Sequence, residues 1–335
     1  MEELAEVSGI SRPTLSKYFN NPDSVRASTR LRIEKALAQY DYRPNVYAMN
    51  QNRERTRNIG VVVPYLADPF FTEIGRVLEL ACIEAGYSPI LLSSHGSTKL
   101  ENENLESLRA LKPAGVLLAP LGRISDRKAI DSFAREVPLV LFDSNLEGAG
   151  EAFVGANTFH NVDLMVEYLC RSGQPPCLFE MRTPSNPNAN KRRQAYLESM
   201  ARHGHEAHVF QADGDGWDFE EIGSSEGGRM LADKLFPTRT ILCSNDRLAI
   251  GMLSAAYSLG LKVGHGDGCD LRIAGHDDHP FARFTCPPLT TIAQDYAAIA
   301  SRAVETLFGI IESDQRPAAR TETLYDGRLV MRGSA

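Results

Sequence analysis

The sequence predicts a small all-α head at the N-terminus, followed by an α/β core of two lobes with parallel sheets. Three observations support this fold class. Residues 1–43 contain short helical patterns separated by turn residues. From Ile59 onward, short apolar runs alternate with amphipathic helical patterns, which is typical of parallel sheets covered by helices on both faces. This alternation occurs as two similar series, which indicates two lobes with a cleft between them.

The composition is that of a globular protein, and the charge is unevenly distributed. The 335 residues are 43% hydrophobic and 24% charged, with a net charge of −7. Residues 1–57 contain ten Lys/Arg and seven Asp/Glu, so this segment is +3 and the remainder is −10. A basic head on an acidic body suggests a polyanionic partner for the head alone.

The expected cellular location and the expected redox state of the cysteines follow from signals that the sequence does not contain. No apolar run approaches the roughly 18 residues of a membrane span. The opening "MEELAEVSGI" has acids where a signal peptide has bases, and it has no apolar centre. We therefore expect a cytoplasmic protein. The six cysteines form no C-x-x-C pair, which favours reduced thiols over disulfides or a zinc site.

The first two helices of the head are separated by a sharp turn. The first helix is expected to end at Gly9, because glycine adopts the left-handed conformation that a helix end requires. Ser11 is a good N-cap for the next helix, and Pro13 falls in its first turn, where a missing N–H costs little. Leu15 and Phe19 form the buried side of this second helix. Two helices joined in this way predict a helix-turn-helix unit.

The second helix presents polar residues on its exposed side. When such a helix lies in the major groove of DNA, these residue types read base edges and hold phosphates. They are Arg12, Thr14, Ser16 and Lys17. The rest of the small core is expected from the apolar residues of the first and third helices. These are Leu4, Ala5, Val7, Leu31, Ile33 and Leu37. An ordinary helical hairpin at the start of an enzyme would show the same spacing, so that alternative stays open here.

The core is predicted element by element from residue 59. The first series has strands over 59–65, 88–94, 114–120 and 138–144, with helices over 70–86 and 102–113 between them. The second series is expected to begin near 152–158. It continues with strands over 176–182, 205–212, 239–246 and 271–278, and a helix over 191–204. No G-x-G-x-x-G follows the first strand and no Walker loop occurs, so no dinucleotide or ATP cofactor is expected.

Polar and aromatic residues follow the predicted strands. Ligands bind at the carboxyl ends of the strands in open parallel sheets. Aromatic faces stack on a sugar or a base, and carboxylates, amides and an arginine bond its hydroxyls. The candidate effector-binding residues are Asp68, Phe70, Phe71, Asp143, Arg192, Trp217, Asn245, Asp277 and Gln294. Structural roles are the alternative: core packing for the phenylalanines, a surface anchor for Trp217, a solvated basic run for Arg192 and a turn cap for Asp277.

Metal and catalytic sites are not expected. In "GHDDHPF", His276, Asp277, Asp278 and His279 are all potential ligands, but adjacent residues on a strand alternate faces and rarely converge on one ion. No H-E-x-x-H and no G-x-S-x-G elbow occurs, and no cysteine has a clear local partner. We therefore expect no metal, no catalytic residues and no enzymatic activity.

Three stretches together resemble the DNA-binding head of the lactose-repressor/galactose-repressor (LacI/GalR) family. They are "LAEVSGISRPTLSKYFN", "TRLRIEKALAQYDYRPN" and "NIGVVVP", and the resemblance continues almost to the C-terminus. It implies a helix-turn-helix domain over 1–43, a hinge helix or linker over 44–57, and a two-lobed, periplasmic-binding-protein-like core over 58–335. The implied DNA-binding residues are Ser11, Arg12, Pro13, Thr14, Ser16, Lys17, Asn20, Arg43, Asn45, Ala48, Met49 and Gln51. Gln51 stands where the family usually has a leucine that kinks the minor groove, and Met49 is a possible substitute.

The resemblance also implies a function. Arg192, Asn245 and Asp277 match the family's R-x-x-[GA]-[FY], N-D and G-x-D-D motifs. Asp68 stands where many members carry Asn, so we expect it to accept hydroxyls. The expected protein is a homodimeric transcriptional regulator of operator DNA, controlled by a small effector, most often a sugar in this family. The alternatives are a sugar-binding protein without a DNA role, a purine- or nucleoside-responsive regulator, and a sugar- or nucleoside-processing enzyme with Asp68 or Asp277 as base.

Overall fold

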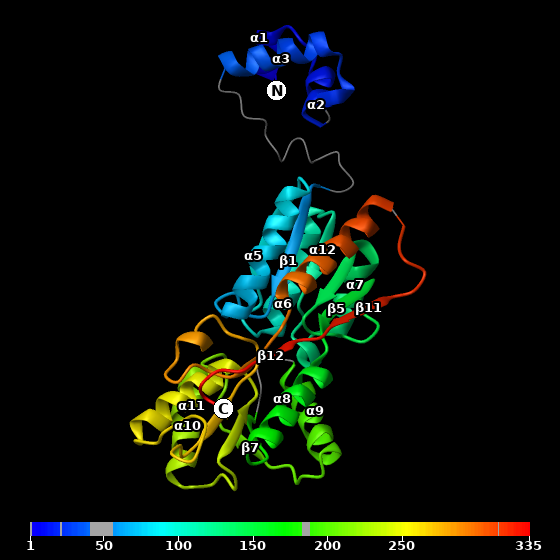
Figure 1. Ribbon diagram of the computed structural model, residues 1–335. Helices are drawn as coiled ribbons and strands as arrows, with labels where there is room; N and C mark the ends of the chain where they lie inside the picture. Colours follow the sequence, from blue (N-terminus) through cyan, green and yellow to red (C-terminus); the bar gives the residue numbers. More distant parts are fainter. Residues whose placement is uncertain (1, 21, 41–55, 183–187, 314) are drawn as a thin grey trace. The chain divides into compact units, whose positions relative to one another are not determined.

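The computed structural model describes the whole chain except residues 1, 21, 41–55, 183–187 and 314 (Figure 1). The chain divides into two compact units, Met1–Thr56 and Arg57–Ala335. Among the described residues, no helix combines the length and the apolar character needed to cross a bilayer.

The first unit is a three-helix head with a small core. Its elements are α1 (Glu2–Ser8), α2 (Arg12–Asn20), the 3-10 turn η1 (Pro22–Ser24) and α3 (Ala27–Gln39). Gly9 ends α1 with a φ of 62°, as expected. The core is formed by buried Leu4, Ile10, Leu15, Ile33 and Ala36, with Ala5, Tyr18, Phe19 and Leu37 packed against it.

Two of the predicted core residues of the head are exposed instead. Val7 is 47% exposed and Leu31 is 66% exposed. The buried stripe of α3 runs through Ile33, Ala36 and Leu37, which share one face because they are three and four residues apart. Leu31 lies two positions before Ile33, so the helical turn carries it to the opposite face. The prediction for these two residues was wrong.

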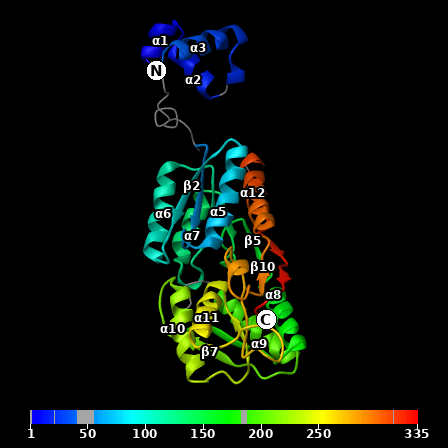
Figure 2. The same ribbon diagram turned by 60° about the vertical axis from the view of Figure 1, so that its left-hand side comes forward.

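The second unit begins with a six-stranded parallel sheet in the order β11-β5-β4-β3-β1-β2. Its strands are β1 (Asn58–Val63), β2 (Ser88–Ser93), β3 (Gly115–Leu118), β4 (Leu139–Phe142), β5 (Ala152–Ala156) and β11 (Thr321–Tyr325). The helices of this first lobe are α5 (Pro69–Glu84), α6 (Thr98–Leu111), α7 (Arg127–Glu136) and α12 (Tyr296–Ser313). Figure 2 shows α6 and α12 on opposite sides of the sheet, with α5 beside α12.

Both faces of this sheet are buried, which explains its near-continuous apolar strands. Ile59, Val61 and Val63 pack with residues of α5 and α12 in one cluster. Val62 points to the other face and packs with residues of α6 and α7. This alternation is the two-residue period of a strand.

The second lobe is built on a four-stranded parallel sheet in the order β7-β6-β8-β9. Its strands are β6 (Cys177–Met181), β7 (Val209–Ala212), β8 (Thr240–Cys243) and β9 (Arg272–Ala274). Residues of α8 (Thr158–Ser172) and α9 (Ala189–Arg202) cluster on one face. Residues of α10 (Phe219–Ala232) and α11 (Asp246–Ser258) cluster on the other. An antiparallel pair, β10 (Thr291–Ala293) and β12 (Arg328–Val330), completes the unit.

One strand belongs to a different lobe than expected. The second series was predicted to begin near residues 152–158, but β5 pairs in parallel with β4 and completes the first sheet, with Ala152 opposite Val140. The chain therefore enters the second lobe only after β5, through α8. The pattern of apolar runs shows that a strand exists, but strand pairing is a non-local property that the pattern does not encode.

Candidate functional site

A cavity of about 400 Å³ lies between the two lobes of the second unit. It is lined by Asp68, Pro69, Phe70, Phe71, Glu73, Asp143, Arg192, Phe219, Asn245, Asp246, Arg247, Asp277, Asp278, His279, Pro280, Arg283, Gln294, Tyr296 and Arg332. All the predicted effector-binding residues except Trp217 line it. Its volume is within the range of small-molecule sites.

The sheet topology explains why residues so distant in sequence meet here. Asp68 is the N-cap of α5, soon after β1, and Asn245 is the N-cap of α11, directly after β8. Asp143 follows β4, Asp277 follows β9 and Gln294 follows β10. Except for β10, which belongs to the antiparallel pair, these strands lie in the two parallel sheets, and the carboxyl ends of such strands are where an open α/β sheet places its ligands.

Two of these residues have unfavourable backbone conformations. Asp143 has a φ of 59° and Asp277 a φ of 115°. A non-glycine residue held in such a region costs roughly 1–3 kcal/mol, and such residues concentrate at ligand sites. The strain supports a binding role for both aspartates over a turn cap at Asp277.

Arg192 organises the floor of the cavity. It is 5% exposed, and its guanidinium forms a two-pronged pair with the Asp277 carboxylate. Its Nη1 also donates to the Ser244 carbonyl at 2.6 Å, and Gln294 Nε2 donates to Asp277 Oδ1 at 2.6 Å. Burial raises the pKa of Asp277, and Arg192 opposes that rise. The paired contacts between Arg192 and Asp277 fix the orientation of both side chains. Arg192 is therefore not part of a solvated basic run.

Asn245 is the N-cap of α11 and also lines the cavity. Its Oδ1 accepts a hydrogen bond from the Leu248 N–H at 2.8 Å. That bond fixes the amide orientation, so the NH₂ end is the one left for a ligand. The next residue, Asp246, is 1% exposed and accepts from the His279 N–H at 2.7 Å and the Thr291 hydroxyl at 2.6 Å.

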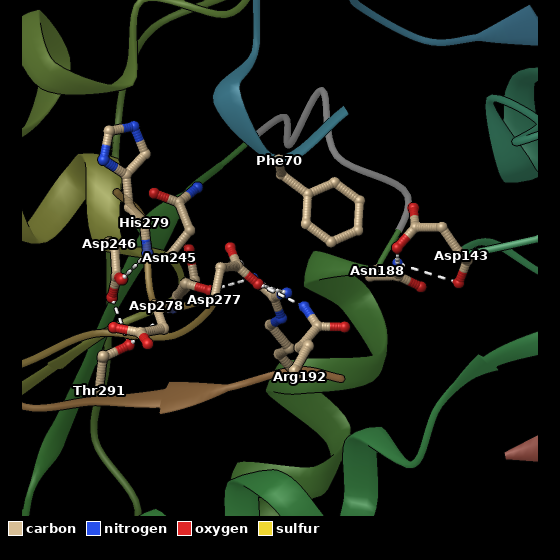
Figure 3. Close-up of polar contacts among 12 residues, drawn as sticks. Phe70, Asp143, Asn188, Arg192, Asn245, Asp246, Asp277, Asp278, His279 and Thr291 are labelled. Carbon is tan, nitrogen blue, oxygen red and sulfur yellow. Dashed lines mark hydrogen bonds and ion pairs between the residues drawn. The ribbon is translucent and has the colours of Figure 1, made fainter. Parts of the chain in front are cut away.

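Two buried carboxyl groups of the cavity have raised pKa values. Burial raises the pKa of Asp143 to about 7, and burial followed by repulsion from Asp277 raises the pKa of Asp246 to about 7. Asp143 is 7% exposed, and its Oδ1 accepts from Asn188 Nδ2 at 3.0 Å (Figure 3). Perturbed carboxyl groups in a closed cleft are typical of a functional site.

Aromatic rings form the apolar part of the wall. Phe70 packs edge-on against Phe71 at 4.8 Å and against Tyr296 at 5.1 Å between ring centroids. In Figure 3 the Phe70 ring stands between Asn245 on one side and Asp143 with Asn188 on the other. One aromatic face is thus presented among polar groups, an arrangement suited to a ring with an apolar face and polar edges.

Trp217 does not reach the cavity wall. Its ring is stacked on Tyr65 at 5.1 Å and packs edge-on against Phe71 and Phe219, which do line the cavity. The only tryptophan of the chain therefore packs between the lobes behind two residues that line the cavity, and its ligand contact stays a prediction.

Sequence reasoning missed several lining residues. Arg247 follows the Asn245–Asp246 pair, and Phe219 lies two residues after Trp217, so both were adjacent to residues already singled out. His279 follows Asp278 in the stretch considered for a metal site, and Tyr296 lies two residues after Gln294, whereas Arg283 and Arg332 had no comparable signal. The four residues of "HDDH" diverge: Asp277 pairs with Arg192, and Asp278 pairs with Arg332 at 2.6 Å.

The predicted DNA-binding residues of the head lie on and before α2. Ser11, Arg12, Pro13 and Lys17 are exposed, whereas Thr14 and Ser16 are half-buried. Ser11 Oγ is 2.9 Å from Thr14 Oγ1. The side chain of Asn20 and the residues Arg43, Asn45, Ala48, Met49 and Gln51 lie outside the described part of the chain. The side of α2 opposite buried Leu15 is thus open to a partner.

Comparison with known proteins finds two matching family models. Residues 1–45 match the model for bacterial regulatory proteins of the lacI family, and residues 167–335 match the periplasmic binding protein-like domain. The ribose operon repressor of Escherichia coli K12 is 27% identical over 337 residues, covering 100% of this chain and 99% of that protein. The HTH-type transcriptional repressor CytR of the same organism is 30% identical over 339 residues, covering 100% and 95%.

The fold is also found among solved structures. The lac repressor dimer bound to operator and the anti-inducer ONPF superposes with a TM-score of 0.84 at 24% identity, covering 99% of this chain and 97% of that one. A LacI family regulator from Enterococcus faecium with bound ribose superposes with a TM-score of 0.69 at 20% identity, covering 83% and 98%. These likenesses confirm the predicted fold class.

Proposed function

The chain belongs to the lacI family of bacterial regulatory proteins, and on this premise we propose that it is a repressor whose affinity for operator DNA is set by a small effector. The exposed side of α2 lies in the major groove of the operator, with Arg12, Pro13 and Lys17 towards the bases. Two copies of the chain bind a pseudo-palindromic site together, because two heads then read two half-sites.

The observation that carries the effector proposal is the composition of the closed cavity. The Phe70 ring stands among polar groups fixed by their own hydrogen bonds, including the Asn245 amide and the Arg192–Asp277–Gln294 group. Fixed donors and acceptors around one apolar face favour a neutral polyhydroxylated ring, because each hydroxyl both donates and accepts. We therefore propose a sugar as the effector.

A nucleoside is the second candidate, and a specific observation favours it. Four aromatic residues line the cavity, namely Phe70, Phe71, Phe219 and Tyr296. A purine or pyrimidine base stacks on such rings, and its ribose offers hydroxyls to the same polar groups. A panel that contains both pentoses and their nucleosides separates the two classes.

The effector acts by favouring one arrangement of the lobes. It changes operator affinity only as far as it binds one arrangement better than the other, and couplings of this kind are typically about 1–3 kcal/mol, or 5- to 150-fold in affinity. Because the coupling is reciprocal, operator DNA must change effector affinity by the same factor.

The test is a gel shift on DNA from upstream of the gene, with random-sequence DNA as control and with pentoses, hexoses and nucleosides added in turn. We expect a retarded complex with the upstream fragment at physiological salt, and a change of at least fivefold in its dissociation constant with one member of the panel. Equal affinity for upstream and random DNA with every compound contradicts the proposal.

A further inference from the structure

Arg247 connects the two lobes at the edge of the cavity. It is the second residue of α11 in the second lobe, and its Nη1 lies 3.0 Å from Oδ2 of Asp68 in the first lobe. Its Nε and Nη2 each donate to Glu220 on α10 at 2.7 Å. Its guanidinium also lies over the Phe219 ring, 5.0 Å from the centroid. The side chain is thus held rigidly on the second lobe and directed at the first.

Asp68 uses both carboxylate oxygens in contacts with the protein. Its Oδ1 accepts from the Phe70 N–H at 2.9 Å as the N-cap of α5, and its Oδ2 takes the Arg247 guanidinium. The exposed fractions of the Asp68 and Arg247 side chains are 9% and 16%, so solvent screens this pair much less than a surface pair. Each carboxylate oxygen of Asp68 thus already accepts one hydrogen bond from the protein, one of them from the opposite lobe.

Other contacts also join the lobes around the same cavity. Trp217 of the second lobe stacks on Tyr65 of the first with an angle of 14° between ring planes. Asn188, just before α9, donates to Asp143, just after β4. The walls of the cavity are therefore brought together by the protein's own side chains, at points on different elements.

From this arrangement we propose that Arg247 is a positioning residue that clasps the two lobes through Asp68, so that the effector cavity is already closed before an effector enters. Glu220 and Phe219 hold the guanidinium in place, and Asp68 is the residue of the first lobe that it contacts. The effect of the clasp on regulation by an effector rests on the proposed function, whereas the closure of the two lobes does not.

The clasp has a calculable effect on effector affinity. When only the closed arrangement binds, the apparent dissociation constant equals the intrinsic one divided by the closed fraction. Losing the clasp lowers that fraction and therefore raises the apparent constant. If the closed fraction is near one in the wild type and falls tenfold in a variant, the variant binds the effector about tenfold more weakly. The fully liganded form of either protein stays closed.

Trp217 reports closure without any label or effector. It is the only tryptophan in the chain and is 6% exposed in the closed arrangement. Opening the lobes separates it from Tyr65 and Phe71, which belong to the first lobe. Its emission then shifts to longer wavelength, and acrylamide quenches it more strongly.

The experiment compares the full-length protein with Arg247→Gln and Asp68→Asn, without effector or DNA, at a single pH. Asp68→Asn keeps the N-cap, because Asn and Asp cap equally well, and removes only the charge. Arg229→Gln is the matched control, since its ion pair with Glu226 lies within α10 and joins no lobes. We expect Trp217 quenching to rise about twofold or more in both clasp variants and not in the control, with a larger radius of gyration in solution scattering.

The double variant Asp68→Asn/Arg247→Gln provides the second criterion. If the two residues act as one clasp, its quenching equals that of either single variant and does not add. If Asp68→Asn shows the same Trp217 quenching and the same radius of gyration as the wild type, the clasp proposal is overturned. This holds even if Arg247→Gln fails to fold. That result leaves the regulator proposal intact, because neither effector nor operator enters the measurement.

Discussion

Substitution of Asn245 separates its observed role as a helix cap from its proposed role as a ligand contact. Asn245 is 6% exposed, its Oδ1 caps α11, and its NH₂ end is left for the ligand. Asn245→Ala removes both roles. Asn245→Ser keeps an oxygen for the Leu248 N–H, because serine caps as well as asparagine, but it removes the NH₂ donor. We therefore expect the two variants to differ in stability and to agree in ligand binding.

The magnitudes follow from one cap and one hydrogen bond. Loss of the cap in Asn245→Ala lowers the free energy of unfolding by about 1 kcal/mol, with a range of 0.5–2. Loss of one neutral hydrogen bond to the ligand is worth about 0.5–1.5 kcal/mol, which weakens effector binding about 2- to 12-fold in both variants. The serine variant retains the free energy of unfolding of the wild type within about 0.5 kcal/mol.

The assays are urea denaturation followed by circular dichroism, and calorimetric titration with the tightest-binding compound of the sugar and nucleoside panel. The reasoning fails if Asn245→Ser binds that compound as tightly as the wild type, because the amide NH₂ then makes no ligand contact. It also fails if Asn245→Ser is as unstable as Asn245→Ala, because the cap then contributes nothing.

Three further predictions concern the head, the helix crossing and pH. Lys17→Ala weakens operator binding and reduces the slope of log affinity against log salt concentration by about 1. The effector affinity measured by calorimetry stays unchanged. Unchanged DNA affinity in this variant counts against α2 as the recognition helix. Gly251→Ala places a Cβ 2.1 Å from the Glu220 carbonyl oxygen where α10 crosses α11, so urea denaturation should show a loss of about 1–3 kcal/mol. Gly309→Ala, on a helix with open space around it, should instead be neutral or stabilising by up to about 1 kcal/mol. Because the pKa of Asp143 rises to about 7 on folding, from an ordinary value near 4, the folded state binds its proton more tightly, and the free energy of unfolding falls as pH rises from about 4 to 7. Asp143→Asn should make that decline shallower in urea titrations across this range, and an unchanged slope contradicts the assignment.

Local patterns predicted the elements of the core well. β1 is a short continuous apolar run, whereas α5 carries the 3.6-residue period of a helix. The strands β11 and β12 were not predicted, because they are short and partly exposed and therefore lack a strong apolar run. The lobe of β5 was assigned wrongly for a different reason, since its partners are set by packing between distant segments.

The candidate site was predictable to the extent that strand ends are predictable. Asp143, Asn245 and Asp277 were identified because each follows a recognisable apolar strand, and parallel strands bring their ends together. Trp217 packs behind Phe71 and Phe219, and a sequence does not show which of several neighbouring aromatic rings faces a cavity. The stacking on Tyr65 depends on the distance between lobes, which no local pattern encodes.

Asp68 and Asn245 show why a residue type at a strand end does not define its role. Both cap a helix at the cavity, so the sequence suggests a ligand contact for each. The difference lies in the remaining polar atom: Asp68 Oδ2 is taken by Arg247 from the opposite lobe, whereas the Asn245 NH₂ faces no such partner among the described residues. Asn245→Ser should therefore weaken effector binding without changing Trp217 quenching in the effector-free protein, and Asp68→Asn should change both. If the two substitutions gave the same pair of results, lobe closure and ligand contact could not be assigned to different residues, and the distinction drawn from the Arg247 pair would be wrong.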